Sequence, residues 1–197
     1  SEANLSQSNL SGLRLDDAQF RGSVLFRTRL RGASLCKANL SEADISGADL
    51  SESNMTESII IQAYLSGAVL KNANLTGANI RGSNMFGATL DAVHLDGADM
   101  RGANIVLVTM RHSYLSWANL GGAIISDTDL SSSVLNDVIL RGSDLRELDL
   151  SRLDMTRADL TGAYLEDVDL SGANLMGAVL DGAIMKNVDL SSARGLD

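Results

Sequence analysis

The sequence predicts an all-β solenoid, in which the chain coils around a filled apolar core. Every residue whose number is a multiple of five, from Leu5 to Leu190, is apolar, and most of these 38 residues are leucine. The residue two places before each is small, most often alanine or serine, and 16 of the 18 glycines lie two places after one. Proline is absent from all 197 residues, as expected where backbone N–H groups bond to neighbouring coils.

A period of five residues excludes the two regular alternatives. On an α-helix five residues turn the chain by about 500°, so successive leucines would scatter around the cylinder. On a flat strand an odd step places successive leucines on opposite faces. If the backbone is extended briefly and then turns, the leucine and the small residue point the same way. Glycine suits such a turn because it adopts positive φ at little cost. The chain must therefore coil.

Segments such as ADLSG, ANLTG, ADLTG and ANLMG resemble the A(D/N)LXX motif of the pentapeptide-repeat proteins. The resemblance covers residues 3–193 and implies a right-handed quadrilateral β-helix with four pentapeptides per turn. The 38 pentapeptides then give about 9.5 turns. We expect residues 1–197 to form a single domain of this kind. Because the repeats leave almost no residues to cover the ends, we also expect the domain to be excised from a longer chain.

The composition narrows the classes of partner. A formal net charge of -9 opposes direct binding of nucleic acid, which needs a basic face. The longest stretch without Asp, Glu, Lys or Arg, residues 112–126, is too short and too polar to span a bilayer. The single cysteine, Cys36, leaves no internal disulfide. We expect a soluble protein, cytoplasmic by default, whose true compartment the sequence leaves open.

No residue pattern typical of a catalytic, cofactor or metal site is present in the sequence. His94 and His112 fall on different faces of the predicted coil, and Cys36 lies far along the axis from both. The glycines follow the repeat register instead of forming a phosphate-binding loop. A filled rod also lacks a substrate cavity. We expect no enzyme activity, no cofactor and no metal.

Residues 20 apart should stack in columns, because four pentapeptides make one turn. The face that contains residues 5, 25 and 45 carries outward apolar side chains, and those on adjacent turns would form a continuous patch. The candidate interaction residues are Phe26, Tyr64, Phe86, Val106, Leu107, Ile124 and Tyr164. Scattered surface apolar residues are also ordinary. If the patch is functional, homodimerisation is the use we expect.

The next face carries a column of acids: Asp129, Asp149, Asp169 and Asp189. Like charges at that spacing repel, so the column indicates either hydrogen bonding to turn amides or a functional negative field. The family's preference for Asp or Asn favours the first. Charge also differs along the axis: residues 21–40 contain five cations and no acid, whereas residues 159–189 contain six acids and one lysine. Such a dipole could steer a partner.

Three functions are compatible with this sequence. The first is a structural scaffold that presents one face to a protein partner or to itself. The second follows from the resemblance, since some pentapeptide-repeat proteins mimic DNA and bind type II topoisomerases such as gyrase. Net charge and the acidic column favour it, whereas the basic turn at residues 21–40 opposes it. The third is the repeat domain of a secreted bacterial effector, which an excised domain would suit.

Overall fold

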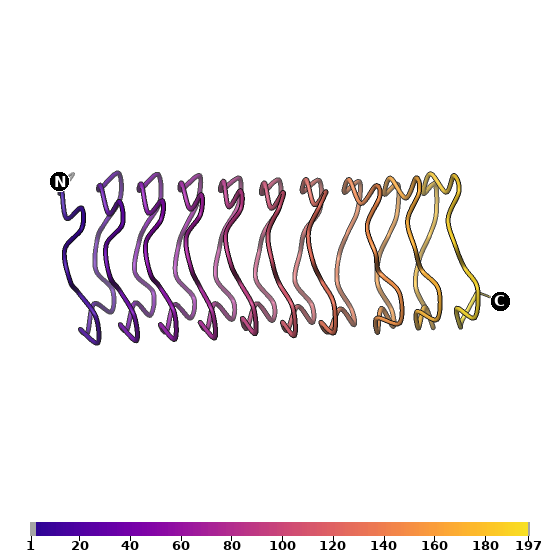
Figure 1. Cartoon of the computed structure of the whole chain (residues 1–197), viewed down its shortest axis with the longest axis horizontal. Helices are drawn as coiled ribbons and strands as arrows, with labels where there is room; N and C mark the ends of the chain where they lie inside the picture. Colours follow the sequence, from indigo (N-terminus) through magenta and orange to yellow (C-terminus); the bar gives the residue numbers. More distant parts are fainter. Residues whose placement is uncertain (1–2, 197) are drawn as a thin grey trace.

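The computed structural model describes residues 3–196, and the chain winds along a single axis from one end to the other (Figure 1). Each pentapeptide contributes one residue to an isolated parallel β-bridge and two residues to a turn or bend. The described residues therefore contain no helix and no continuous strand. The bridges join residues twenty apart, from Asn4 with Val24 to Asn174 with Arg194. One coil thus consists of four pentapeptides, as predicted.

The turn of each pentapeptide needs a left-handed residue two places after the repeat centre. Gly87 has a φ of 64°, and its N–H donates to the carbonyl of Val106 in the next coil at 3.0 Å. Leu107 and Trp117 adopt the same backbone, with φ of 58° and 59°. A side chain in this region costs about 1–2 kcal/mol, a cost that glycine escapes. Leu107 and Trp117 therefore hold large apolar side chains on a strained backbone.

The repeat centres and the small residues two places before them fill the interior. Every centre from Leu25 to Leu175 is buried. The centres of the first coil, such as Leu5, are only partly buried, and Met185 in the last coil is exposed, because an end coil has a neighbour on one side only. The predicted inward register is confirmed wherever a coil is stacked on both sides.

Several small interior residues are polar, and most of them bond to the preceding coil. The hydroxyl of Ser113 donates to the carbonyl of Leu90 at 2.9 Å, and that of Ser143 donates to the carbonyl of Leu120 at 2.8 Å. These bonds offset the cost of burying a hydroxyl. Within the described residues, the hydroxyls of Ser53, Ser58 and Thr109 are buried without a partner.

The ladder of bridges is interrupted at one place. Asp129 bridges to Thr109 and Asp149 bridges to Asp169, but no bridge joins Asp129 to Asp149. Two successive pentapeptides here carry leucine where the repeat has a small residue: Leu148 and Leu153, which are 3% and 4% exposed. An oversized side chain in a packed core moves the backbone. The predicted column of four aspartates is therefore broken after its first member.

Candidate protein-interaction face

The first face is the side of the coil that contains residues 3–7 and every pentapeptide twenty residues further on. We number the coils by the centre on this face, so that Leu5 lies in coil 1, Met85 in coil 5, Ile105 in coil 6 and Met185 in coil 10. Among the residues predicted to form an interaction patch, five are exposed: Tyr64, Phe86, Leu107, Ile124 and Tyr164. Phe26 and Val106 are half-buried, because neighbouring side chains cover part of each.

The middle of this face is continuous across coils 4 to 7. Tyr64, Phe86, Leu107 and Ile124 lie on four consecutive coils, and Phe86 and Leu107 are 45% and 52% exposed. Val106 stacks beside Phe86 and bridges the two coils, since its carbonyl accepts the Gly87 N–H. These five apolar side chains thus lie on one face in four consecutive coils, with Asn84 and Asn104 between Tyr64 and Ile124 in their column. We call the five residues the apolar patch.

The two ends of the first face carry further apolar side chains. In coil 2, Val24 is exposed and the guanidinium of Arg27 lies 5.0 Å from the ring centroid of Phe26. In coils 8 to 10 the face is hollowed, with a cavity of about 330 Å³. Its lining combines apolar and charged side chains: Asp144, Arg146, Tyr164, Glu166 and Ile184. The tyrosine and the isoleucine are both exposed there.

The charges of the first face are arranged unevenly. The guanidinium of Arg146 donates to both carboxylate oxygens of Asp144, at 2.8 and 2.6 Å, and this hydrogen bonding lowers the pKa of Asp144. The ammonium of Lys186 lies 3.3 Å from Glu166. Within residues 3–196, neither Arg27 nor Asp167 forms an ion pair. Arg27 instead lies over the ring of Phe26, and the carboxylate of Asp167 accepts a hydrogen bond from the side-chain amide of Asn187 at 2.9 Å.

The aspartates of the acidic column accept hydrogen bonds from turn amides. The backbone N–H two residues further on donates to the carboxylate at 3.0, 2.9, 2.7 and 2.8 Å in the four members: Asp129, Asp149, Asp169 and Asp189. Bonding to Ser151 lowers the pKa of Asp149, and bonding to Ser191 lowers that of Asp189. These hydrogen bonds are the structural role that the sequence favoured, and they stabilise the turns.

The third face contains residues 13–17 and every pentapeptide twenty residues further on, and it carries aromatic side chains one coil apart. The rings of His94 and Tyr114 are stacked, with centroids 4.5 Å apart and an interplanar angle of 5°. The imidazole Nδ1 of His94 lies 3.8 Å from the carboxylate of Asp96. Trp117 is exposed next to this stack in sequence. The rings of His94 and Tyr114 thus pack on each other, whereas the indole of Trp117 is exposed.

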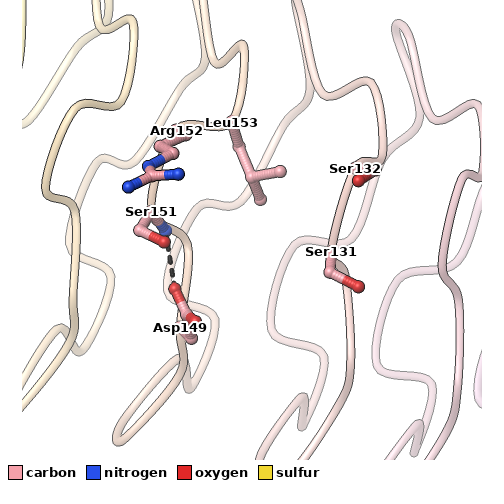
Figure 2. Close-up of a pocket in the computed structure, with 6 residues that line it drawn as sticks. All are labelled: Ser131, Ser132, Asp149, Ser151, Arg152 and Leu153. Atoms are coloured by element: carbon pink, nitrogen blue, oxygen red, sulfur yellow. Dashed lines mark hydrogen bonds between the residues drawn. The ribbon is translucent and has the colours of Figure 1, made fainter.

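The interrupted ladder opens a cavity that sequence reasoning missed. Figure 2 shows Leu153 and the two serines Ser131 and Ser132 on opposite sides of a gap between neighbouring coils. The cavity has a volume of about 200 Å³, and the hydroxyl and N–H groups of Ser151 lie beside Asp149. The available signal was the pair of leucines at positions where the repeat has small residues. Because Leu148 and Leu153 are larger than the usual residues at these positions, they are expected to push the neighbouring coils apart.

Three other features bear on function: a possible metal site, the free cysteine and a possible membrane-spanning helix. Among residues 3–196, no group of three or more His, Cys, Asp or Glu side chains is placed to hold a metal ion. Cys36 is a half-buried free thiol. The described part of the chain also has no helix that is long and apolar enough to cross a membrane.

The family of this chain follows from its repeats. The family described as pentapeptide repeats matches it in eight copies, which together cover residues 1–57 and 60–194. This chain belongs to the pentapeptide-repeat family. A comparison with curated proteins gave no match.

Solved structures of other pentapeptide-repeat proteins resemble this one. HetL, from the cyanobacterium Nostoc sp. strain PCC 7120 and involved in heterocyst differentiation regulation, is 31% identical with a TM-score of 0.53. The match covers 98% of this chain and 89% of HetL. QnrB1, a plasmid-mediated fluoroquinolone resistance protein, is 19% identical over 96% of this chain and 92% of its own, with a TM-score of 0.47. The resemblance to HetL supports a β-helical solenoid.

Proposed function

We propose that this pentapeptide-repeat protein is a non-enzymatic scaffold that binds a protein partner through its first face. The observation that carries the proposal is the exposure of Tyr64, Phe86, Leu107 and Ile124 on four consecutive coils. Contiguous exposed apolar side chains are typical of protein interaction surfaces.

The shape of the scaffold follows from the family. We infer a right-handed quadrilateral β-helix of about 9.5 turns, the geometry that the repeats imply. The twenty-residue spacing of the bridges supports four pentapeptides per turn. Such a rod is stiff, because each coil is bonded to the next through its backbone. A stiff rod presents its first face as one flat surface.

Affinity purification from the native cell tests the proposal. The tagged wild type is compared with Phe86→Lys/Leu107→Lys and with a matched control, Trp117→Lys, whose exposed side chain lies on the third face. Proteins that bind the first face, including untagged copies of this chain, should be lost from the double variant only. Equal recovery with all three proteins would exclude the first face as the docking surface.

A DNA-mimicking protein that binds gyrase is a second candidate. It is favoured by the net charge of -9 and by the column Asp149, Asp169 and Asp189, which places carboxylates one coil apart on the second face. The measurement is DNA supercoiling by gyrase with and without this protein. A change in supercoiling that Asp149→Asn/Asp169→Asn abolishes would support mimicry. No change with excess protein would remove it.

A further inference from the structure

We propose that the occupant of the first face is a second copy of this chain, docked antiparallel about a two-fold axis that passes between coils 5 and 6. This inference rests on the proposed function, since it names the partner of the same face. It adds the orientation of the partner and the residues that meet.

The symmetry fixes which side chains meet. A two-fold axis that lies in the interface, across the two rods, reverses the order of the coils and keeps each column of side chains opposite itself. Coil 5 then faces coil 6 of the copy, coil 4 faces coil 7, and coil 2 faces coil 9. The face matches itself under this rotation if the residues that share a column in paired coils are complementary in shape and charge.

The centre of the face matches itself in shape. Phe86 in coil 5 lies opposite Val106 in coil 6, so that two apolar side chains meet. Leu107 in coil 6 lies opposite Gly87 in coil 5. A Cβ placed at Gly87 would meet nothing within 4 Å, so the glycine leaves open space in front of the backbone. The exposed leucine of one copy therefore enters the gap that the glycine of the other leaves.

The flanks also place apolar side chains opposite one another. Tyr64 in coil 4 faces Ile124 in coil 7, and both are exposed in the single chain. Val24 in coil 2 faces Tyr164 in coil 9, where the face is hollowed by the cavity of about 330 Å³. Val24 thus has a hollow to enter, and Phe26 lies opposite Glu166, which lines the same hollow. Each of these contacts occurs twice, because the two copies are equivalent.

Charge favours the same orientation. Arg27 in coil 2, which has no ion partner within residues 3–196, lies opposite Asp167 in coil 9 and next to Glu166. Asp44 in coil 3 lies opposite Asp144 in coil 8, since both belong to the same column, and the Asp144 carboxylate is held by two bonds from the Arg146 guanidinium. The basic end of one copy thus meets the acidic end of the other at coils 2 and 9, while the carboxylates of Asp44 and Asp144 meet beside the guanidinium of Arg146.

The parallel alternative lacks this complementarity. A two-fold axis along the rods would keep each coil at the same height as itself. Arg27 would then lie at the height of its own copy, across the width of the face, and the acids Glu166 and Asp167 at the height of theirs, so Arg27 would meet neither acid of the copy. Like charges across an interface oppose association. The charge distribution therefore selects the antiparallel pair.

Sedimentation equilibrium tests the dimer directly. The wild type should sediment as a dimer, and Phe86→Lys/Leu107→Lys as a monomer, with a dissociation constant raised about a hundredfold or more. Trp117→Lys should remain a dimer. Circular dichroism and melting of each variant verify folding, and since the substituted side chains are exposed, the coils should be retained.

A charge exchange tests the orientation. Arg27→Glu should raise the dissociation constant about tenfold, because a glutamate then faces Asp167 of the copy. Asp167→Arg should do the same, and the double variant Arg27→Glu/Asp167→Arg should restore the wild-type value. Residues 27 and 167 are seven coils apart in one chain, about 34 Å at a spacing of about 4.8 Å. Rescue can therefore arise only between two copies.

The outcomes separate the inference from the proposed function. A wild type that is monomeric at every concentration would overturn the dimer, while loss of other proteins from Phe86→Lys/Leu107→Lys in the affinity purification would keep the first face as a docking surface. A dimer without charge-exchange rescue would overturn the antiparallel orientation. Dimerisation that the double lysine variant retains would place the contact on another face and overturn the inference.

Discussion

The imidazole ring of His94 lies parallel to the phenol ring of Tyr114, with the ring centroids 4.5 Å apart. The two residues are twenty positions apart and joined by a parallel bridge, so their rings stack across two adjacent coils. Replacing Tyr114 by alanine should lower the free energy of unfolding by about 0.5–1.5 kcal/mol. Urea denaturation measures this, with Trp117→Ala as the control, an exposed aromatic side chain on the same face whose ring is not stacked within residues 3–196. An equal effect of the two substitutions would exclude a contribution from stacking.

The buried hydroxyls predict opposite effects of two similar substitutions. Within residues 3–196, the hydroxyl of Ser58 has no hydrogen-bond partner, whereas the hydroxyl of Ser113 donates to the carbonyl of Leu90 at 2.9 Å. Ser58→Ala removes an unsatisfied polar group and should raise the free energy of unfolding by about 1 kcal/mol. Ser113→Ala removes one of the two hydrogen bonds to the Leu90 carbonyl, which keeps the bond from the Val93 N–H, and should lower the free energy of unfolding by about as much. Melting curves that move in the same direction for both variants would be inconsistent with this assignment.

The widened gap predicts that one buried leucine is easily replaced. Leu148 occupies a position that holds a small residue elsewhere, so Leu148→Ala should restore regular spacing and cost less than about 2 kcal/mol. Leu145→Ala, at a repeat centre, should cost about 2–5 kcal/mol. Hydrogen exchange should also show slower exchange of the Leu130 and Ser132 amides in Leu148→Ala, as the coils close. Unchanged exchange would mean that the leucine does not cause the gap.

The aspartates predict how stability depends on pH. Hydrogen bonding lowers the pKa of Asp149 in the folded chain below its unfolded value of about 4. A lowered folded pKa contributes stability above the unfolded pKa, and this contribution is lost as the pH falls through the folded pKa. Stability should therefore fall below about pH 4, and Asp149→Asn should reduce that fall, since asparagine accepts the same bond without titrating. Chemical denaturation between pH 3 and 7, about the range where carboxylates titrate, measures it.

The control for this pH dependence is Asp181→Asn. No hydrogen bond of the Asp181 side chain is present within residues 3–196. The substitution should therefore leave the acid-induced loss of stability in place. If Asp149→Asn and Asp181→Asn behave alike, hydrogen bonding at the turn is not the source of the effect.

The sequence is sufficient to predict the coil because its constraint is local and repeated. An apolar residue at every fifth position is compatible with few backbone conformations. The burial of the repeat centres from Leu25 to Leu175 follows directly. The columns of the first face follow in turn, since stacking depends only on the twenty-residue spacing. Phe86 and Leu107 could thus be placed on adjacent coils before any coordinates.

Other features depend on volume and on side-chain conformation, which periodicity does not specify. The gap next to Asp149 arises because Leu148 and Leu153 are too large for their positions, an effect of packing. The two bonds from Arg146 to Asp144 depend on rotamers. The half-burial of Phe26 depends on its neighbours, Arg27 among them. These three features therefore follow from the folded structure and could not be predicted from the repeat alone.

The coil of twenty residues is tested most directly by engineered disulfides on the third face, away from the proposed interface. Asn54 and Asn74 are bridged, so in a Cys36→Ser background the pair Asn54→Cys/Asn74→Cys should oxidise to an intramolecular disulfide. The pairs Asn54→Cys/Val69→Cys and Asn54→Cys/Asn79→Cys, which match coils of fifteen and twenty-five residues, should stay reduced. Mass spectrometry after mild oxidation reads the result. A disulfide in either of those two pairs, with none between positions 54 and 74, would disprove the twenty-residue coil and with it the columns on which the interaction face depends.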